Sequence, residues 1–172
     1  MIVLQPFAET SLSTQVLVLA ERKAGELIVN FTLSGDLDSL VIPSAKDVPM
    51  RRDGLWGNTC FECFFAPVGK SEYWEMNFSP SGDWNCYSFA DYRQGMQEDP
   101  AVKVLPVQLG GHGDVLTVSV SFSLPSSVAT TDIEVGLCAV VKEKTGKMSY
   151  WAFRHPADQP DFHDRRSFGV TL

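Results

Sequence analysis

The chain has 172 residues, of which 44% are hydrophobic and 20% charged, a composition typical of a globular domain and not of a disordered segment. Its 14 Lys and Arg against 21 Asp and Glu give a formal net charge of −7. A surface this acidic repels phosphate backbones and anionic lipids, so we expect neither nucleic acid nor a membrane as a partner.

The sequence indicates a protein of a reducing compartment. It has no apolar run of the roughly 18 residues that a membrane span needs, and its first residues carry no secretion signal. We therefore expect a soluble, cytoplasmic protein whose four cysteines are reduced thiols. Cys60 and Cys63 form a C-x-x-C motif, but residues three apart in a strand point to opposite faces, so we expect core thiols and not a metal site.

Short β-rich runs separated by glycine and proline turns dominate the sequence. In chain order, the predicted strands are 15–19, 26–33, 40–43, 60–65, 73–78, 84–89, 102–108, 115–122, 133–141, 148–153 and 167–172. A helical period is not sustained over about ten residues anywhere in the sequence. About ten or eleven short strands predict an all-β fold, an antiparallel two-sheet β-sandwich of jelly-roll or immunoglobulin-like type. We expect residues 1–172 to form this single domain.

The predicted strands around Glu62 and Glu75 alternate between apolar and polar residues. Pairing Glu62 near Asn77 or Glu75 places every apolar residue on the core face, whereas the other register buries Glu62 against Met76. The opposite face then carries Glu62, Tyr73, Glu75 and Asn77, joined by Asn85 and Tyr87 from the next strand. A solvated sheet explains such a face, but aromatic rings beside carboxyl and amide groups also suit a sugar.

Two long irregular stretches, 48–58 and 154–166, are rich in Trp, Arg, His and Asp. Long loops in a compact domain often carry function. Trp56 lies near the end of the first stretch, and Trp151 precedes the second. A tryptophan is most often a core residue, but beside a long loop it can also be a platform on which a sugar ring stacks.

Other chemistry has weaker support. His155, Asp161 and His163 are candidate metal ligands, yet their spacing matches no established metal motif, and hydrogen bonding within the loop explains the same residues. Glu62 and Glu75 are residue types that a glycosidase uses as an acid–base pair, but the sequence does not fix their separation. The sequence has no nucleophile elbow, phosphate loop or dinucleotide-binding motif.

Several stretches resemble the DOMON-like domains and, more distantly, the family nine carbohydrate-binding modules. They are RDGLW at 52–56, CFECF at 60–64 and YWEMNFSPSGDWN at 73–85. The later runs YWAFRHP at 150–156 and PDFH at 160–163 are similar to the small stand-alone bacterial DOMON-like proteins. The resemblance extends from about Leu27 to the end of the chain. It implies a β-sandwich in which one concave sheet, roofed by loops, holds a ligand.

The resemblance also implies a site. In the sugar-binding modules a tryptophan lies six residues before a glutamate, as Trp56 does before Glu62, and a second late tryptophan, here Trp151, completes a sandwich around the sugar. The ligand-binding residues predicted in this way, or from their shared face, are Trp56, Glu62, Trp151, Asn77, Arg52, Glu75, Tyr73, Asn85 and His155.

The leading hypothesis is a non-catalytic domain that binds a sugar or sugar derivative. Other DOMON domains bind haem through a methionine and a histidine, so a haem or other cofactor carrier is an alternative. An enzyme that uses Glu62 and Glu75, or a metal such as calcium held by His155, Asp161 and His163, is another.

Overall fold

The computed structural model describes residues 1–10, 13–104 and 106–172. Within these residues the chain forms twelve strands and three short 3₁₀ helices. The strands are β1 (Ile2–Pro6), β2 (Gln15–Lys23), β3 (Glu26–Ser34), β4 (Cys60–Pro67), β5 (Tyr73–Phe78), β6 (Trp84–Phe89), β7 (Gln97–Glu98), β8 (Gln108–His112), β9 (Val115–Ser123), β10 (Ile133–Lys142), β11 (Met148–Ala152) and β12 (Val170–Thr171). The 3₁₀ helices are η1 (Leu37–Ser39), η2 (Leu55–Gly57) and η3 (Arg165–Ser167). In these parts of the chain no helix is long and apolar enough to cross a bilayer.

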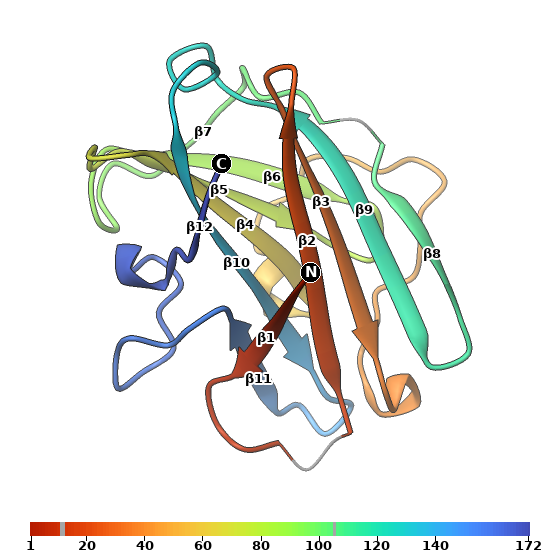
Figure 1. Cartoon of the computed structure of the whole chain (residues 1–172). Helices are drawn as coiled ribbons and strands as arrows, with labels where there is room; N and C mark the ends of the chain where they lie inside the picture. The colour runs from red at the N-terminus through yellow and green to blue at the C-terminus, as the bar shows by residue number, and fades with distance from the viewer. Residues whose placement is uncertain (11–12, 105) are drawn as a thin grey trace.

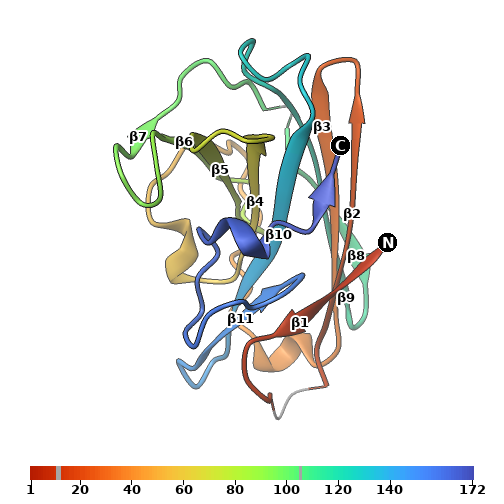
Figure 2. The ribbon, with the colours of Figure 1, turned by 60° about the vertical axis from the view of Figure 1, so that its left-hand side comes forward.

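The strands pack as two antiparallel layers, which confirms the predicted β-sandwich (Figure 1 and Figure 2). One layer has the order β1-β2-β3-β9-β8, and the other has the order β7-β6-β5-β4-β10-β11. Strand β12 pairs with β10. Strand β1 joins the layers, because Leu4 lies opposite Val16 of β2 whereas Gln5 lies opposite Ala152 of β11.

The main core lies between the layers and is built from alternate residues of each strand. Strand β3 contributes Leu27, Val29, Phe31 and Leu33. From the facing layer, β4 and β5 contribute Phe61, Cys63, Phe65, Trp74, Met76 and Phe78. The rings of Phe31 and Phe61, one from each layer, have centroids 5.0 Å apart. All four cysteines are described, and each is buried and free.

Strand boundaries differ from the sequence prediction where strands are short. Strand β1 was not predicted, because its run is short and ends at Pro6, which has no N–H to donate. Residues 40–43 form only an isolated bridge between Leu40 and Glu143, and Pro43 ends the run.

The second difference falls before β9. Residues 102–108, predicted as a strand, contain one bridge between Val104 and Phe122, and Leu105 lies outside the described residues. Strand β8 instead begins at Gln108 and continues through Gly110 and Gly111. Gly111 has a φ of +125°, a backbone conformation that suits glycine. A Cβ at this position would lie 1.9 Å from a backbone oxygen of β9, so the strand requires glycine here.

A second apolar cluster covers the outer face of the layer that contains β4. Part of this cluster comes from the C-terminal segment 153–169, which packs across that face (Figure 2). Phe168 lies directly over Gly136 of β10, where a Cβ would meet its ring at 2.7 Å. The glycine therefore lets the C-terminal segment lie close against the sheet.

Candidate ligand-binding site

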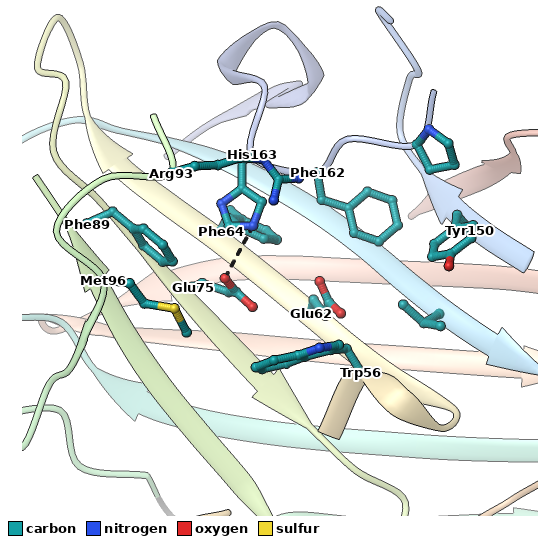
Figure 3. Close-up of a pocket in the computed structure, with 12 residues that line it drawn as sticks. Trp56, Glu62, Phe64, Glu75, Phe89, Arg93, Met96, Tyr150, Phe162 and His163 are labelled. Carbon is teal, nitrogen blue, oxygen red and sulfur yellow. Dashed lines mark ion pairs between the residues drawn. The ribbon is translucent and has the colours of Figure 1, made fainter. Parts of the chain in front are cut away.

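A pocket of about 390 Å³ opens on this outer face. Its floor consists of outward-facing strand residues, namely Glu62 and Phe64 of β4, Glu75 of β5 and Val140 of β10. Its walls are Trp56, Phe89, Arg93, Met96, Tyr150, Pro160, Phe162 and His163. Both carboxyl groups point into the space between Trp56 on one side and Phe162 and His163 on the other (Figure 3).

Strand register brings the two carboxyl groups together. Glu62 lies opposite Asn77 and Phe64 lies opposite Glu75, so Glu62 and Glu75 are diagonal neighbours on one face. This is the register that hydrophobic patterning predicted, and it places Met76 in the main core. The polar outer face is therefore a consequence of burying the apolar residues of β4 and β5.

Glu62 is a buried carboxyl group without a protein partner. It is 3% exposed, and its side chain makes no hydrogen bond with any other described residue. Burial and the negative charge of Glu75 raise its pKa well above the usual value. A ligand that offers a hydrogen bond or a positive charge here relieves the cost of burial.

Glu75 is held by protein groups on both oxygens. Its Oε1 accepts a 2.8 Å hydrogen bond from Nδ2 of Asn77. Its Oε2 lies 3.6 Å from Nε2 of His163, as the dashed line in Figure 3 marks. Burial raises the pKa of Glu75, while the Asn77 hydrogen bond and the charge of Arg93 act in the opposite direction.

His163 is a neutral member of this cluster at neutral pH. Burial and the positive charge of Arg93 lower its pKa to about 4, so its contact with Glu75 is not an ion pair at neutral pH. The Tyr73 hydroxyl accepts the backbone N–H of Arg93 at 3.0 Å and lies 2.8 Å from Nδ1 of His163. If Tyr73 donates to Nδ1, the ring proton sits on Nε2 and faces Glu75.

Two loops meet at the edge of the pocket through Asp161. Its Oδ1 lies 2.8 Å from Nη2 of Arg93, and its other oxygen accepts the hydroxyl of Tyr92. Burial alone would raise the pKa of Asp161, but hydrogen bonds from Tyr92 and Arg93 hold it below the usual value. We call this contact the Asp161 bridge.

Trp56 offers a partly exposed aromatic face. Gly54, in the left-handed conformation at φ +71°, immediately precedes η2, the 3₁₀ helix that carries Trp56. The Trp56 ring packs edge-on against Tyr87 at 5.9 Å and is 38% exposed. Tyr87 donates a 2.6 Å hydrogen bond to Asp53, which fixes the same loop.

The structure brings together three of the predicted ligand residues, since Trp56, Glu62 and Glu75 all line the pocket. Two more predicted residues contact residues that line the pocket. Tyr73 contacts His163, and Asn77 donates to Glu75.

Trp151 is the main correction. It is 3% exposed, lies in the core between the layers, and donates a 2.9 Å hydrogen bond from Nε1 to Ser149. Because strand residues alternate, its neighbour Tyr150 occupies the pocket side of β11. The aromatic residue in this part of the pocket is therefore Tyr150.

Three further predicted residues also lie outside the pocket. Arg52 is 3.2 Å from Asp83, in a separate hollow. Asn85 donates to Tyr87 and to Glu98. His155 lies 2.9 Å from the carbonyl oxygen of Gln5. Each of these side chains contacts a neighbouring strand or loop and does not face the pocket.

The predicted metal ligands do not converge. Among the described residues no group of three or more His, Cys, Asp or Glu side chains could hold a metal ion. Asp161 instead forms the Asp161 bridge, and His163 contacts Tyr73 and Glu75. His155 contacts Gln5, and Asp161 accepts a 3.1 Å hydrogen bond from the backbone N–H of His163. The candidate set of His155, Asp161 and His163 is therefore corrected to residues that bind protein groups and do not form a metal site.

Sequence reasoning missed most of the pocket walls. Phe64 of the floor and Phe89 of the walls could have been found, because each alternates onto the same face as an identified polar residue. The loop residues Arg93, Met96, Pro160 and Phe162 gave no such signal, because their positions depend on how the loops fold over the sheet.

No family model matches the chain, and no curated protein matches it. Among solved structures, a candidate carbohydrate-binding protein from Bacteroides uniformis has a TM-score of 0.60 at 14% identity, over 99% of this chain and 85% of that one. A family nine carbohydrate-binding module from Caldicellulosiruptor kristjanssonii is similar in two structures, both at 12% identity. With cellotriose the TM-score is 0.54, over 91% of this chain and 73% of that one. With glucose it is 0.50, over 88% and 71%. At these identities the similarity shows a shared fold.

Proposed function

We propose that this protein is a non-catalytic module that binds a sugar in the outer-face pocket. The observation that carries the proposal is the placement of Trp56, with a partly exposed ring, across from two buried carboxyl groups. Aromatic faces cover the apolar C–H surface of a sugar, and carboxyl groups bind its hydroxyls. The similarity in fold to modules with glucose or cellotriose bound supports the same class of ligand.

In this proposal each group has a role. Trp56 stacks on one face of the sugar ring, and Tyr150 and Phe162 cover the side where Trp151 was predicted. Glu62 and Glu75 hydrogen-bond to hydroxyl groups. A volume of about 390 Å³ lies at the lower end of the range for small-molecule pockets, which suits one or two sugar rings.

Isothermal titration calorimetry with a panel of mono- and disaccharides tests the proposal. We expect saturable binding of at least one sugar at micromolar to millimolar strength. Trp56→Ala should weaken that binding by about tenfold or more, because the stacking surface is lost. Met50→Ala is the matched control, since Met50 is also an exposed apolar residue but lies outside the pocket. No heat with any sugar, from folded protein, would refute the proposal.

A second candidate, glycoside hydrolysis, is favoured by the two carboxyl groups with raised pKa in one pocket. Incubation with aryl glycosides of several sugars tests it. Release of the aryl group by the wild-type chain, but not by Glu75→Gln, would show catalysis. No release by the wild-type chain would exclude hydrolysis of those glycosides and leave binding as the function.

A further inference from the structure

The groups that line the pocket leave it short of positive charge. Glu62 and Glu75 both face it, and among the described lining residues the one permanent cation is Arg93. The guanidinium of Arg93 is already bound to Asp161 at 2.8 Å. The ring of His163 is neutral at neutral pH. The pocket therefore contains carboxyl groups for which the protein supplies no unshared cation.

Glu62 is the side chain where this shortage is greatest. Glu62 is 3% exposed, and its carboxyl group points into the pocket (Figure 3). Its side chain receives no hydrogen bond from another described residue. Glu75, in contrast, has Asn77 at 2.8 Å and His163 at 3.6 Å. The Glu62 oxygens open onto the pocket, so a ligand there can supply the hydrogen bonds that no described residue makes to them.

The pocket walls also suit a cation. Rings of Trp56, Phe64, Phe89, Tyr150 and Phe162 line it. Aromatic faces attract ammonium groups through their quadrupoles, most strongly in desolvated sites. We call these five rings the aromatic cage, since a positive charge held in the pocket near Glu62 would lie among them.

We propose that the preferred ligand is a sugar with a free amino group, whose ammonium lies between Glu62 and Glu75 within this aromatic cage. The proposal rests on the sugar-binding function above and specifies its substrate class. The ammonium donates hydrogen bonds to the carboxyl group of Glu62, while the rest of the sugar ring stacks on Trp56.

Calorimetry with glucosamine, glucose, N-acetylglucosamine and methylammonium tests this inference. We expect glucosamine to bind more tightly than glucose or N-acetylglucosamine, by about tenfold at a pH where Glu62 is ionised, because a hydrogen bond between charged groups exceeds a neutral one by about that factor. Glu62→Gln should abolish the preference. Glu72→Gln, a charge-matched change at an exposed residue outside the pocket, should keep it.

The outcomes separate the two proposals. Equal binding of glucosamine and glucose would overturn the amino-sugar inference and leave sugar binding intact. Methylammonium binding as tightly as glucosamine, with no binding of glucose, would overturn the sugar proposal itself. Binding of none of the four compounds would overturn the amino-sugar inference. If none of the mono- and disaccharides of the full panel binds either, sugar binding is overturned as well.

Proton release gives a second readout that needs no variant. The titratable and charged groups around Glu62 are Cys60 on the same strand, Glu75 on β5, Cys138 on β10, Tyr150 on β11, and Arg93 and His163 on the loops. Because burial and the charge of Glu75 raise the pKa of Glu62, an ammonium bound beside it should displace its proton, whereas a neutral sugar should not. Glucosamine heats should therefore differ between buffers of different ionisation enthalpy. Identical heats would contradict the ammonium site.

Discussion

Glu62 couples the stability of the protein to pH. In the unfolded chain a glutamate loses its proton near pH 4.3, whereas burial keeps Glu62 protonated to higher pH in the folded chain. Between these two values the folded state binds more protons than the unfolded state. The contribution of Glu62 to the free energy of unfolding is therefore fully present below pH 4.3 and falls as pH rises towards its folded pKa.

Glu62→Gln should remove this dependence. Relative to the wild type, the variant should gain free energy of unfolding as pH rises above about 4.3 towards the folded pKa of Glu62, at up to about 1.4 kcal/mol per pH unit. Urea denaturation at each pH measures the difference. Glu72→Gln should follow the wild type, because Glu72 is exposed. Parallel curves for Glu62→Gln and the wild type would show that Glu62 is ionised in the folded chain.

Trp56 and Trp151 should separate binding from stability. Trp151→Ala removes a ring from the core between the layers and should lower the free energy of unfolding by about 3–5 kcal/mol. Trp56→Ala removes a partly exposed ring and should cost about 1 kcal/mol or less. Urea denaturation of both variants measures the two losses. Equal losses would contradict the placement of these residues.

At the scale of elements, the Asp161 bridge holds two loops over one sheet face. Its ion pair is partly exposed, so it should contribute at most about 1 kcal/mol to stability, yet it positions Arg93 and the segment that carries Phe162 and His163.

Asp161→Asn should therefore weaken sugar binding by about threefold to tenfold with little change in the free energy of unfolding. Calorimetry and urea denaturation together test this expectation. Asp164→Asn is a matched control in the same loop, because Asp164 lies outside the pocket and asparagine also caps 3₁₀ and α-helices well. Unchanged affinity in Asp161→Asn would show that the loops keep their positions without the bridge.

The strands of the site could be predicted from the sequence, whereas its loops could not. The strands around Glu62 and Glu75, and their register, follow from alternation, because one slip would move these carboxyl groups into the apolar core between the layers. The loops could not be placed, because their path depends on distant contacts such as that of Phe168 with Gly136. Tyr150 and Trp151 are adjacent aromatic residues, and only the pairing of β11 with β10 decides which one faces the core.

At the scale of the whole molecule, β1 links the two layers by pairing with one strand of each. Its first residues extend one sheet and its last residues extend the other, with Leu4 buried between them. The layers should therefore unfold together in a single transition.

Deletion of residues 1–6 should lower stability by at least the 2–5 kcal/mol typical of losing a buried leucine side chain. Thermal unfolding measures the loss, and Val3→Ala is the control, because Val3 lies on β1 but is exposed. A melting temperature unchanged by the deletion would contradict the joining role of β1.

The position of β1 has a further consequence for association between molecules. It occupies the free side of β2 in one layer and that of β11 in the other. Without it, both strands would present unpaired N–H and C=O groups, and each would become a template to which a neighbouring chain could add. Five residues of one short strand thus protect two sheet edges from intermolecular β-pairing.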